Sequence, residues 1–142
     1  RGGLWVEGVA GCLRAVDDIV TMIKRLGLQH DASITSRVAR LYSQSRSLRA
    51  MGWKGFASFA QGGSAPEHSY MKVAVSELQQ TLYELGMDVQ GAGLAITAPA
   101  VAQEGGRWQA AFFNALAATI GGGTSEIQRN VIAQQVLGLP RA

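Results

Sequence analysis

The chain has 142 residues, of which 47% are hydrophobic and 16% charged, and its net charge is +3. This length fits one domain, and the apolar share is sufficient for a globular core. One cysteine, Cys12, excludes an intramolecular disulfide and fits a reducing compartment, and its apolar surroundings favour a buried structural thiol. No stretch approaches the roughly twenty apolar residues of a membrane span, and no signal core follows the N-terminus. We therefore expect a cytoplasmic protein without a membrane span.

The sequence is mildly basic and contains two histidines, but neither feature indicates a nucleic-acid partner or a metal site. Several basic residues fall in one region: Arg37, Arg40, Arg46, Arg49 and Lys54. This region has no interleaved stacking series and no named nucleic-acid motif, so we expect a solvated helix face and no nucleic-acid partner. Neither His30 nor His68 has a metal-ligand neighbour at useful spacing, so no metal site is expected.

The first half of the chain predicts two helices. Apolar residues between Leu4 and Leu26 recur at steps of three and four, and Gly27 is a plausible stop. Asp31 or Ser33 can cap a second helix. Its apolar stripe consists of Ile34, Val38, Leu41, Leu48 and Met51, with Phe56 and Phe59 as an extension. A clear break follows at residues 62–66.

The second half predicts the remaining helices. The third helix is the most regular, with apolar residues Met71, Val75, Leu78, Leu82, Leu85 and Val89. Residues 91–106 indicate an irregular connection, and residues 108–120 are again helical. A final helix ends near Gly138, with Pro140 beyond it. Because continuous strand signals are absent, we expect an all-α fold, an up-and-down bundle of four to five helices.

The glycines at residues 121–123 stand directly before this final helix. Glycine permits close approach of a ligand, and Thr124 or Ser125 can cap the helix. Ser125 and Gln128 also have capping-box spacing. Free amides and the helix dipole at such a start favour a phosphate or a carbonyl oxygen. A plain glycine-rich turn explains the run equally well, whereas a nucleotide P-loop is excluded because its lysine is absent.

The segment GGTSEIQRNVIAQQVLGLPR, residues 122–141, resembles the C-terminal signature of the acyl-CoA dehydrogenase family. Residues 1–120 match only as a helical layout with scattered similarities. The resemblance implies that residues 1–142 are a single helical-bundle domain, the C-terminal fragment of a larger three-domain subunit. A chain that opens on Arg1 without a methionine fits a processed or cut product.

The resemblance also implies a site. Gly123 would lie near the acyl-CoA thioester, and Thr124, Ser125 and Glu126 would line the flavin side. Many members carry the catalytic glutamate where this chain has Gly122, so the catalytic base is unassigned.

Two carboxylates, Glu7 and Glu126, are candidates to replace that base. Glu7 is the best acidic candidate, although a solvated role suits it better. Glu126 is more suited to complementing the helix N-terminus than to reaching a substrate. The family's Arg-x-x-Phe-Gly-type flavin contact is also missing, because residues 24–30 contain no phenylalanine.

The function that follows from the resemblance is that of an FAD-dependent acyl-CoA dehydrogenase, an oxidoreductase of lipid catabolism. This domain would supply part of the flavin and substrate site and the oligomer interface. The partners would be an acyl-CoA, further subunits in a homo- or hetero-oligomer (dimer or tetramer), and an electron-transfer acceptor. The isolated chain is expected to be inactive. Two alternatives are a non-catalytic subunit and a stand-alone helical oligomerisation module.

Overall fold

The computed structural model describes residues 3–62, 67–95, 98 and 101–140. Its α-helices are α1 (Gly3–Arg25), α2 (Ala32–Ala60), α3 (Glu67–Gln90), α4 (Arg107–Ala118) and α5 (Ser125–Gln135). Two short 3-10 helices, η1 (Gly91–Ala95) and η2 (Gln103–Gly106), connect α3 to α4. No strand occurs in these described ranges, and the predicted all-α fold is confirmed.

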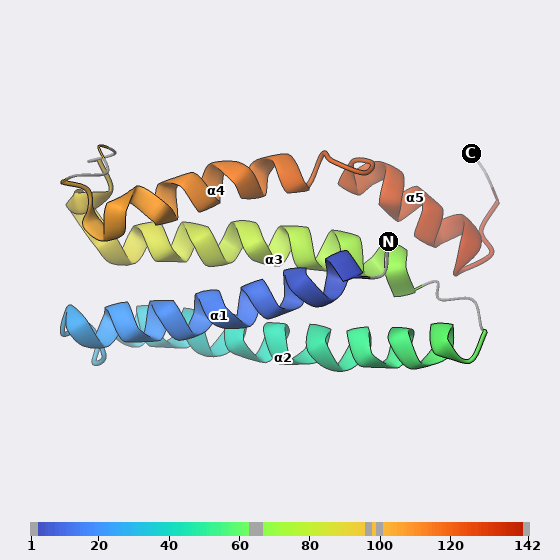
Figure 1. The fold of residues 1–142 in the computed structure, drawn as a ribbon, viewed down its shortest axis with the longest axis horizontal. Coiled ribbons are helices and arrows are strands. Elements are labelled where there is room, and N and C mark those ends of the chain that lie inside the picture. Colours follow the sequence, from blue (N-terminus) through green and yellow to red (C-terminus); the bar gives the residue numbers. More distant parts are fainter. Residues whose placement is uncertain (1–2, 63–66, 96–97, 99–100, 141–142) are drawn as a thin grey trace.

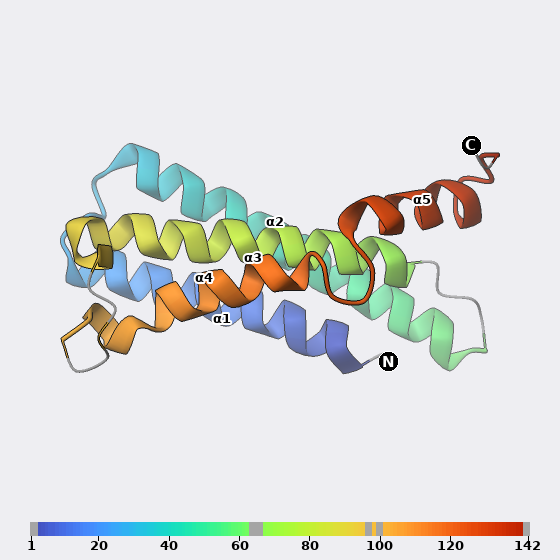
Figure 2. The same ribbon diagram turned by 90° about the horizontal axis from the view of Figure 1, so that it is seen from above.

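Helices α1 to α4 lie side by side as an up-and-down bundle (Figures 1 and 2). Helix α3 is the common partner, since it contacts α1, α2, α4 and α5. Helix α5 lies beyond the end of α4, against α3 (Figure 1). This arrangement joins α4 to α5 through the glycine-rich loop and places that loop next to α3.

The core forms where α1, α2 and α3 meet. The stripe predicted for the third helix is buried, with Leu82 and Leu85 at 0% exposure and Leu78 at 6%. Full burial of such a side chain contributes about 1.5 to 3 kcal/mol. Cys12 joins this core at 1% exposure, and burial raises the pKa of its thiol to about 12. The expectation of a buried structural thiol is therefore confirmed.

The second helix departs from the expected stripe in its last turns. The helix does continue to Ala60, but Phe56 is 54% exposed and packs edge-to-face on Trp53, which is 61% exposed. Phe56 is thus not an extension of the buried face. The Phe59 side chain lies outside the described residues. The basic residues of this helix are largely solvated as expected, although Arg37 pairs with Asp88 of α3 at 2.7 Å.

Several helices begin or end close to the predicted positions, because a capping side chain or a glycine of positive φ stands there. Gly27 has a φ of +71° after α1. The Asp31 carboxylate accepts the N–H of Ser33 at 2.9 Å and of Ile34 at 3.1 Å, so Asp31 rather than Ser33 caps α2. Gly138, at φ +66°, lets the N–H of Leu139 donate to the Ala133 carbonyl at 2.9 Å after α5. In the predicted break at 62–66, residues 63–66 lie outside the described part.

The described part of the irregular connection between α3 and α4 contains a polar cluster centred on Glu104. Glu104 adopts a φ of +50° and accepts hydrogen bonds from Arg25 at 2.7 Å and from the Trp108 indole at 2.8 Å. Arg107 donates to the same carboxylate at 2.7 Å and to Asp18 at 2.8 Å. Burial alone would raise the pKa of Glu104, but these hydrogen bonds hold it below its ordinary value.

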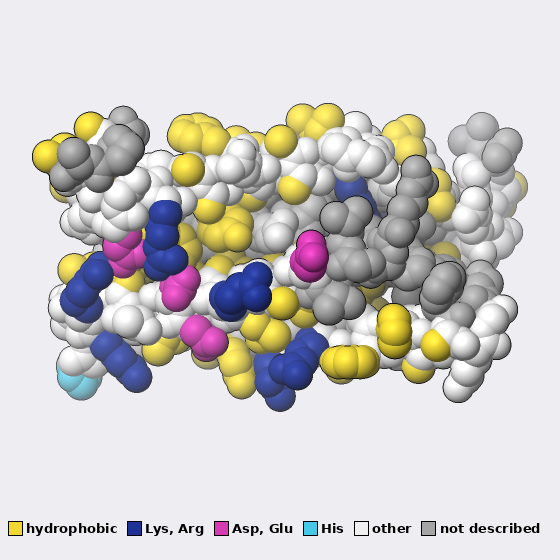
Figure 3. Space-filling model, viewed as in Figure 1, with side chains coloured by type: hydrophobic (Ala, Val, Ile, Leu, Met, Phe, Trp, Pro, Cys, Tyr) yellow, Lys and Arg dark blue, Asp and Glu magenta, His cyan; other side chains and the backbone are white. Residues whose placement is uncertain are grey.

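The surface of the bundle carries charged side chains of both signs (Figure 3). Positive and negative side chains are interspersed over the half of one face that is nearer the turn joining α1 and α2 (Figure 3). Exposed ion pairs between such side chains contribute about 0 to 1 kcal/mol each to the stability of the fold. None of the helices in the described ranges is both long and apolar enough to cross a membrane.

Candidate functional site

The glycine-rich loop after α4 has a backbone that only glycine adopts readily. Gly122 and Gly123 have φ values of +72° and +102°. A Cβ on Gly122 would meet no atom within 4 Å, whereas a Cβ on Gly123 would lie 2.9 Å from the Gln128 amide nitrogen. The loop is therefore open to solvent at Gly122 and closely covered by a side chain at Gly123.

The start of α5 is capped by Thr124. Its hydroxyl oxygen accepts the N–H of Ile127 at 3.4 Å, and its backbone is extended. Gln128 donates to the Gly122 carbonyl at 3.0 Å. The capping box expected from Ser125 and Gln128 is therefore not formed, because Ser125 already lies inside the helix.

Ser125 has an unusual position at this helix start. The residue is 7% exposed, and its hydroxyl has no hydrogen-bond partner among the described residues. Buried hydroxyls in folded proteins are nearly always paired, so an unpaired one is evidence of a missing partner. The Ser125 hydroxyl is thus a donor and acceptor available to a ligand or another chain.

Glu126 follows directly and is exposed. Hydrogen bonds from its own N–H and from the Thr124 hydroxyl lower the pKa of its carboxyl, and the charges of Arg129 and Lys72 act in the same direction. The carboxylate thus complements the helix start, as expected. A general base at this position would require the opposite shift, toward neutral pH.

Lys72 belongs to the candidate site, although the sequence did not single it out. Its side chain extends from α3 and is largely buried, with the residue 8% exposed. The ammonium donates to the Thr119 carbonyl at 3.1 Å and to the Gly123 carbonyl at 2.6 Å. The sequence feature that could have revealed it is a lysine directly after Met71, where the most regular apolar stripe of the chain begins.

Other polar residues of α3 hold the same region. Gln80 donates to the Thr119 hydroxyl at 3.2 Å and to the Ala115 carbonyl at 3.3 Å. Arg129 of α5 forms an ion pair with Glu77 of α3. Helix α3 therefore anchors both the end of α4 and the first turns of α5.

None of the residues considered for the catalytic base places a carboxylate within residues 121–124 of the loop. Glu126 follows in the first turn of α5. Gly122 has no side chain, and Glu7 is exposed on α1, a helix that packs on α2 and α3. Arg25, near the missing flavin-contact segment, is occupied by Glu104. No group of three or more His, Cys, Asp or Glu within the described ranges is placed to hold a metal ion.

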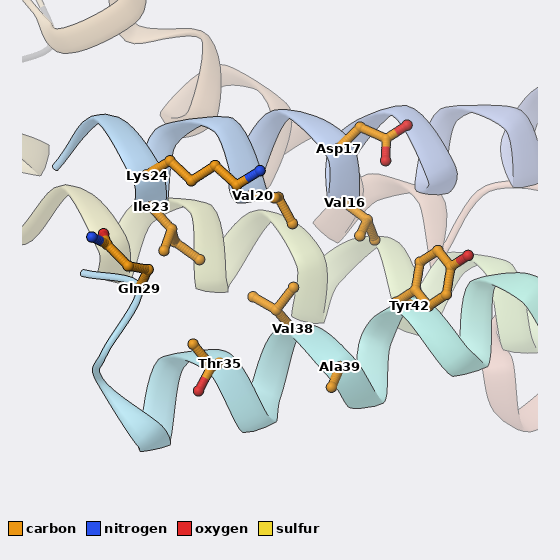
Figure 4. Close-up of a pocket in the computed structure, with 10 residues that line it drawn as sticks. All are labelled: Val16, Asp17, Val20, Ile23, Lys24, Gln29, Thr35, Val38, Ala39 and Tyr42. Atoms are coloured by element: carbon orange, nitrogen blue, oxygen red, sulfur yellow. The ribbon is translucent and has the colours of Figure 1, made fainter. Parts of the chain in front are cut away.

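A separate apolar groove lies between α1 and α2 (Figure 4). It measures about 400 Å³, and Val16, Val20, Ile23 and Val38 form its apolar wall. Asp17 and Lys24 lie at its rim. The groove lies toward the α1–α2 turn, whereas α5 lies at the other end of the bundle, so the groove is no part of the loop site (Figure 1).

The sequence model described as acyl-CoA dehydrogenase, C-terminal domain, matches residues 1–137. The chain therefore belongs to the acyl-CoA dehydrogenase family and has the fold of its C-terminal domain. It is 33% identical over 130 residues to the acyl-CoA dehydrogenase IpdE1 of Mycolicibacterium smegmatis, covering 90% of this chain and 31% of that protein. It is 32% identical over 143 residues to the acyl-CoA dehydrogenase FadE26 of Mycobacterium tuberculosis, covering 94% and 36%.

Solved structures agree on the fold. The Tcur3481–Tcur3483 steroid ACAD matches with a TM-score of 0.83 and 21% identity over 92% of this chain and 35% of that one. The ChsE4–ChsE5 complex from Mycobacterium tuberculosis matches with a TM-score of 0.73 and 28% identity over 95% and 36%. The chain spans about a third of the length of the curated relatives it matches.

Proposed function

We propose that the loop and first turn of α5 are this domain's contribution to the site of an FAD-dependent acyl-CoA dehydrogenase. Gly123 would lie beside the acyl-CoA thioester, and Thr124, Ser125 and Glu126 would line the flavin side. The observation that supports this assignment is the buried, unpaired hydroxyl of Ser125 beside two glycines of positive φ. FAD would supply the acceptor for the hydride that leaves the substrate's β-carbon.

The residues present fit part of a flavin site. The Ser125 hydroxyl is a neutral hydrogen-bond donor, which suits an oxygen-rich ligand. The N–H groups of Glu126 and Ile127 are already bonded to the Glu126 carboxylate and to the Thr124 hydroxyl. Thr124 contributes by fixing the helix start, because its hydroxyl oxygen already accepts the Ile127 N–H. These residues bind and orient, and none of them removes a proton from the substrate.

The proton-abstracting carboxylate must come from outside this loop. Gly122 cannot accept a proton, and the interactions at Glu126 lower the pKa of its carboxyl, which makes it a weaker base. Glu7 remains the candidate within this chain. The alternative is that this subunit is non-catalytic and pairs with a catalytic one, which the bare Gly122 position favours. The hetero-oligomer, the electron acceptor and the cytoplasmic location are parts of the same proposal.

Substitution of Ser125 by alanine tests the flavin-side assignment in the full-length protein. Removal of an unpaired buried hydroxyl should leave the flavin-free protein equally stable or slightly more stable. The same change should weaken flavin retention, because the flavin loses a hydrogen-bond partner. A hydroxyl with a purely structural role would instead lower the stability of the flavin-free protein.

The measurements are the melting midpoint without flavin and the flavin absorbance that remains after gel filtration. Addition of a straight-chain acyl-CoA, and separately of a CoA thioester with a steroid-derived acyl group, tests turnover by bleaching of that absorbance. The steroid substrate is included because one structural neighbour is described as a steroid ACAD. Unchanged flavin retention in Ser125→Ala would contradict the assignment.

A further inference from the structure

Lys72 brings a positive charge into the interior next to the loop. Its residue exposure is 8%, and no ion pair joins it to a carboxylate in the described part of the chain. A buried ammonium is costly unless hydrogen bonds and opposite charge compensate it. Two carbonyl oxygens supply this compensation, those of Thr119 and Gly123. The first belongs to the end of α4, where the helix dipole is negative.

The second hydrogen bond fixes the orientation of a peptide group. A trans peptide is planar, so the carbonyl of Gly123 and the N–H of Thr124 point in opposite directions. Because the Gly123 carbonyl points at the Lys72 ammonium, 2.6 Å away, the Thr124 N–H points away from it. A flipped peptide would present a carbonyl oxygen where the N–H now lies, and that oxygen would repel a ligand oxygen.

The glycines do not determine this orientation by themselves. Glycine populates both signs of φ about equally, so residues 122 and 123 permit either direction of the peptide. The Gln128 amide holds the Gly122 carbonyl at 3.0 Å, and Lys72 holds the next one. The lysine contact is the charged one, and hydrogen bonds to charged groups are roughly twice as strong as neutral ones.

From this geometry we propose that Lys72 is a positioning residue, which fixes the Gly123–Thr124 peptide with its N–H directed away from α3. The proposal rests on the proposed function for the identity of the ligand, but the anchoring of the loop does not depend on it. Lys72 acts through the loop and touches no reacting atom. Its second contact, with Thr119, ties the loop to the end of α4.

The test uses the full-length protein and three variants. Lys72→Met keeps most of the length of the side chain and removes the charge and the donors. Lys72→Arg keeps the charge and the donors. Lys54→Met is the matched control, since it makes the same change at an exposed lysine of α2. If Lys72→Met does not fold, Lys72→Gln takes its place, because its amide retains a donor in the buried site.

Amide hydrogen exchange of the flavin-free variants measures directly how firmly Lys72 holds the loop. Lys72→Met should speed exchange at residues 119–126 by about tenfold or more, the factor expected for one lost charge-assisted hydrogen bond. Residues 107–118 of α4, Lys54→Met and Lys72→Arg should stay close to the parent protein. Exchange that rises equally throughout α4, or not at all, would overturn the proposal and leave Lys72 a general packing residue.

Flavin retention is the second readout. The same loss of anchoring should weaken flavin binding in Lys72→Met, with partial recovery in Lys72→Arg. Faster loop exchange with unchanged flavin binding would show that the peptide orientation has no effect on the ligand, and this would also overturn the positioning role. Should the parent protein bind no flavin, the proposed function fails, and the exchange of residues 119–126 still decides whether Lys72 holds the loop.

Discussion

Gly86 of α3 is a position where an added methyl group should destabilise the protein. A Cβ at Gly86 would lie 2.2 Å from the Cε3 atom of Trp108 and 2.5 Å from its Cζ3 atom. The Trp108 ring cannot move aside easily, because the residue is 2% exposed and its indole N–H donates to Glu104. Arg107 also stacks over the ring, 4.8 Å from its centroid.

Two opposing contributions determine the size of the effect. Alanine is favoured over glycine inside a helix by about 1 kcal/mol. Overpacking of a rigid core costs about 1 to 3 kcal/mol, and contacts far below 3.0 Å place Gly86→Ala at the upper end of that range. We therefore expect a net loss of about 2 kcal/mol in the free energy of unfolding.

Gly11→Ala is the matched control. Gly11 lies inside α1, and a Cβ there would meet no atom within 4 Å, so the helix-propensity gain should appear alone. Urea unfolding followed by circular dichroism gives both free energies. The reasoning is refuted if Gly86→Ala is as stable as the parent while Gly11→Ala gains stability, because the close packing of α3 on Trp108 would then be wrong.

Three further predictions concern the core, the cap and acid stability. Leu78→Ala should cost about 2 to 5 kcal/mol, because Leu78 is 6% exposed in the core; an unchanged melting midpoint would contradict the register of α3. Thr124→Val should weaken flavin retention and lose the cap on Ile127, worth about 0.5 to 2 kcal/mol, whereas Thr124→Ser should keep both; equal flavin occupancy in the two variants would count against the role. The pKa of Glu104 is lower in the folded state, so its stabilisation is present above the unfolded pKa and is lost as pH falls through the folded pKa. Glu104→Gln should therefore flatten the acid limb of the melting-midpoint profile, and an unaltered limb would show that the carboxylate contributes nothing.

Local patterns were sufficient to predict most of the fold. The helix periods depend on residues three and four apart, and the stops at Gly27 and Gly138 depend on the conformation of one residue. Both kinds of information are contained in a short window of sequence. The same windows misled at Phe56, because periodicity locates a face of a helix but cannot show whether another helix covers it.

The candidate site could be predicted only in part. The glycines and Thr124 were recognisable because loop and cap chemistry is local. The anchoring by Lys72 was not, because its acceptors are carbonyls 47 and 51 residues away along the chain. Backbone carbonyls have no sequence signature, so a contact of this kind appears only when α3 and the loop are brought together.

The two sides of α3 have different tasks, and this separates stability from function. One side carries the apolar stripe around Leu78 and Leu82, which packs into the core. The other carries Lys72, Glu77 and Gln80, which hold the loop, α5 and the end of α4. Substitutions on the first side should lower the free energy of global unfolding. In the molecules that remain folded, the loop should be unchanged. Substitution of Glu77 or Gln80 should loosen residues 119–129 with little change in global unfolding, because exposed or partly exposed polar contacts contribute less than buried apolar area. The position of the glycine-rich loop is therefore set by a few polar side chains on a helix that the core already holds rigid.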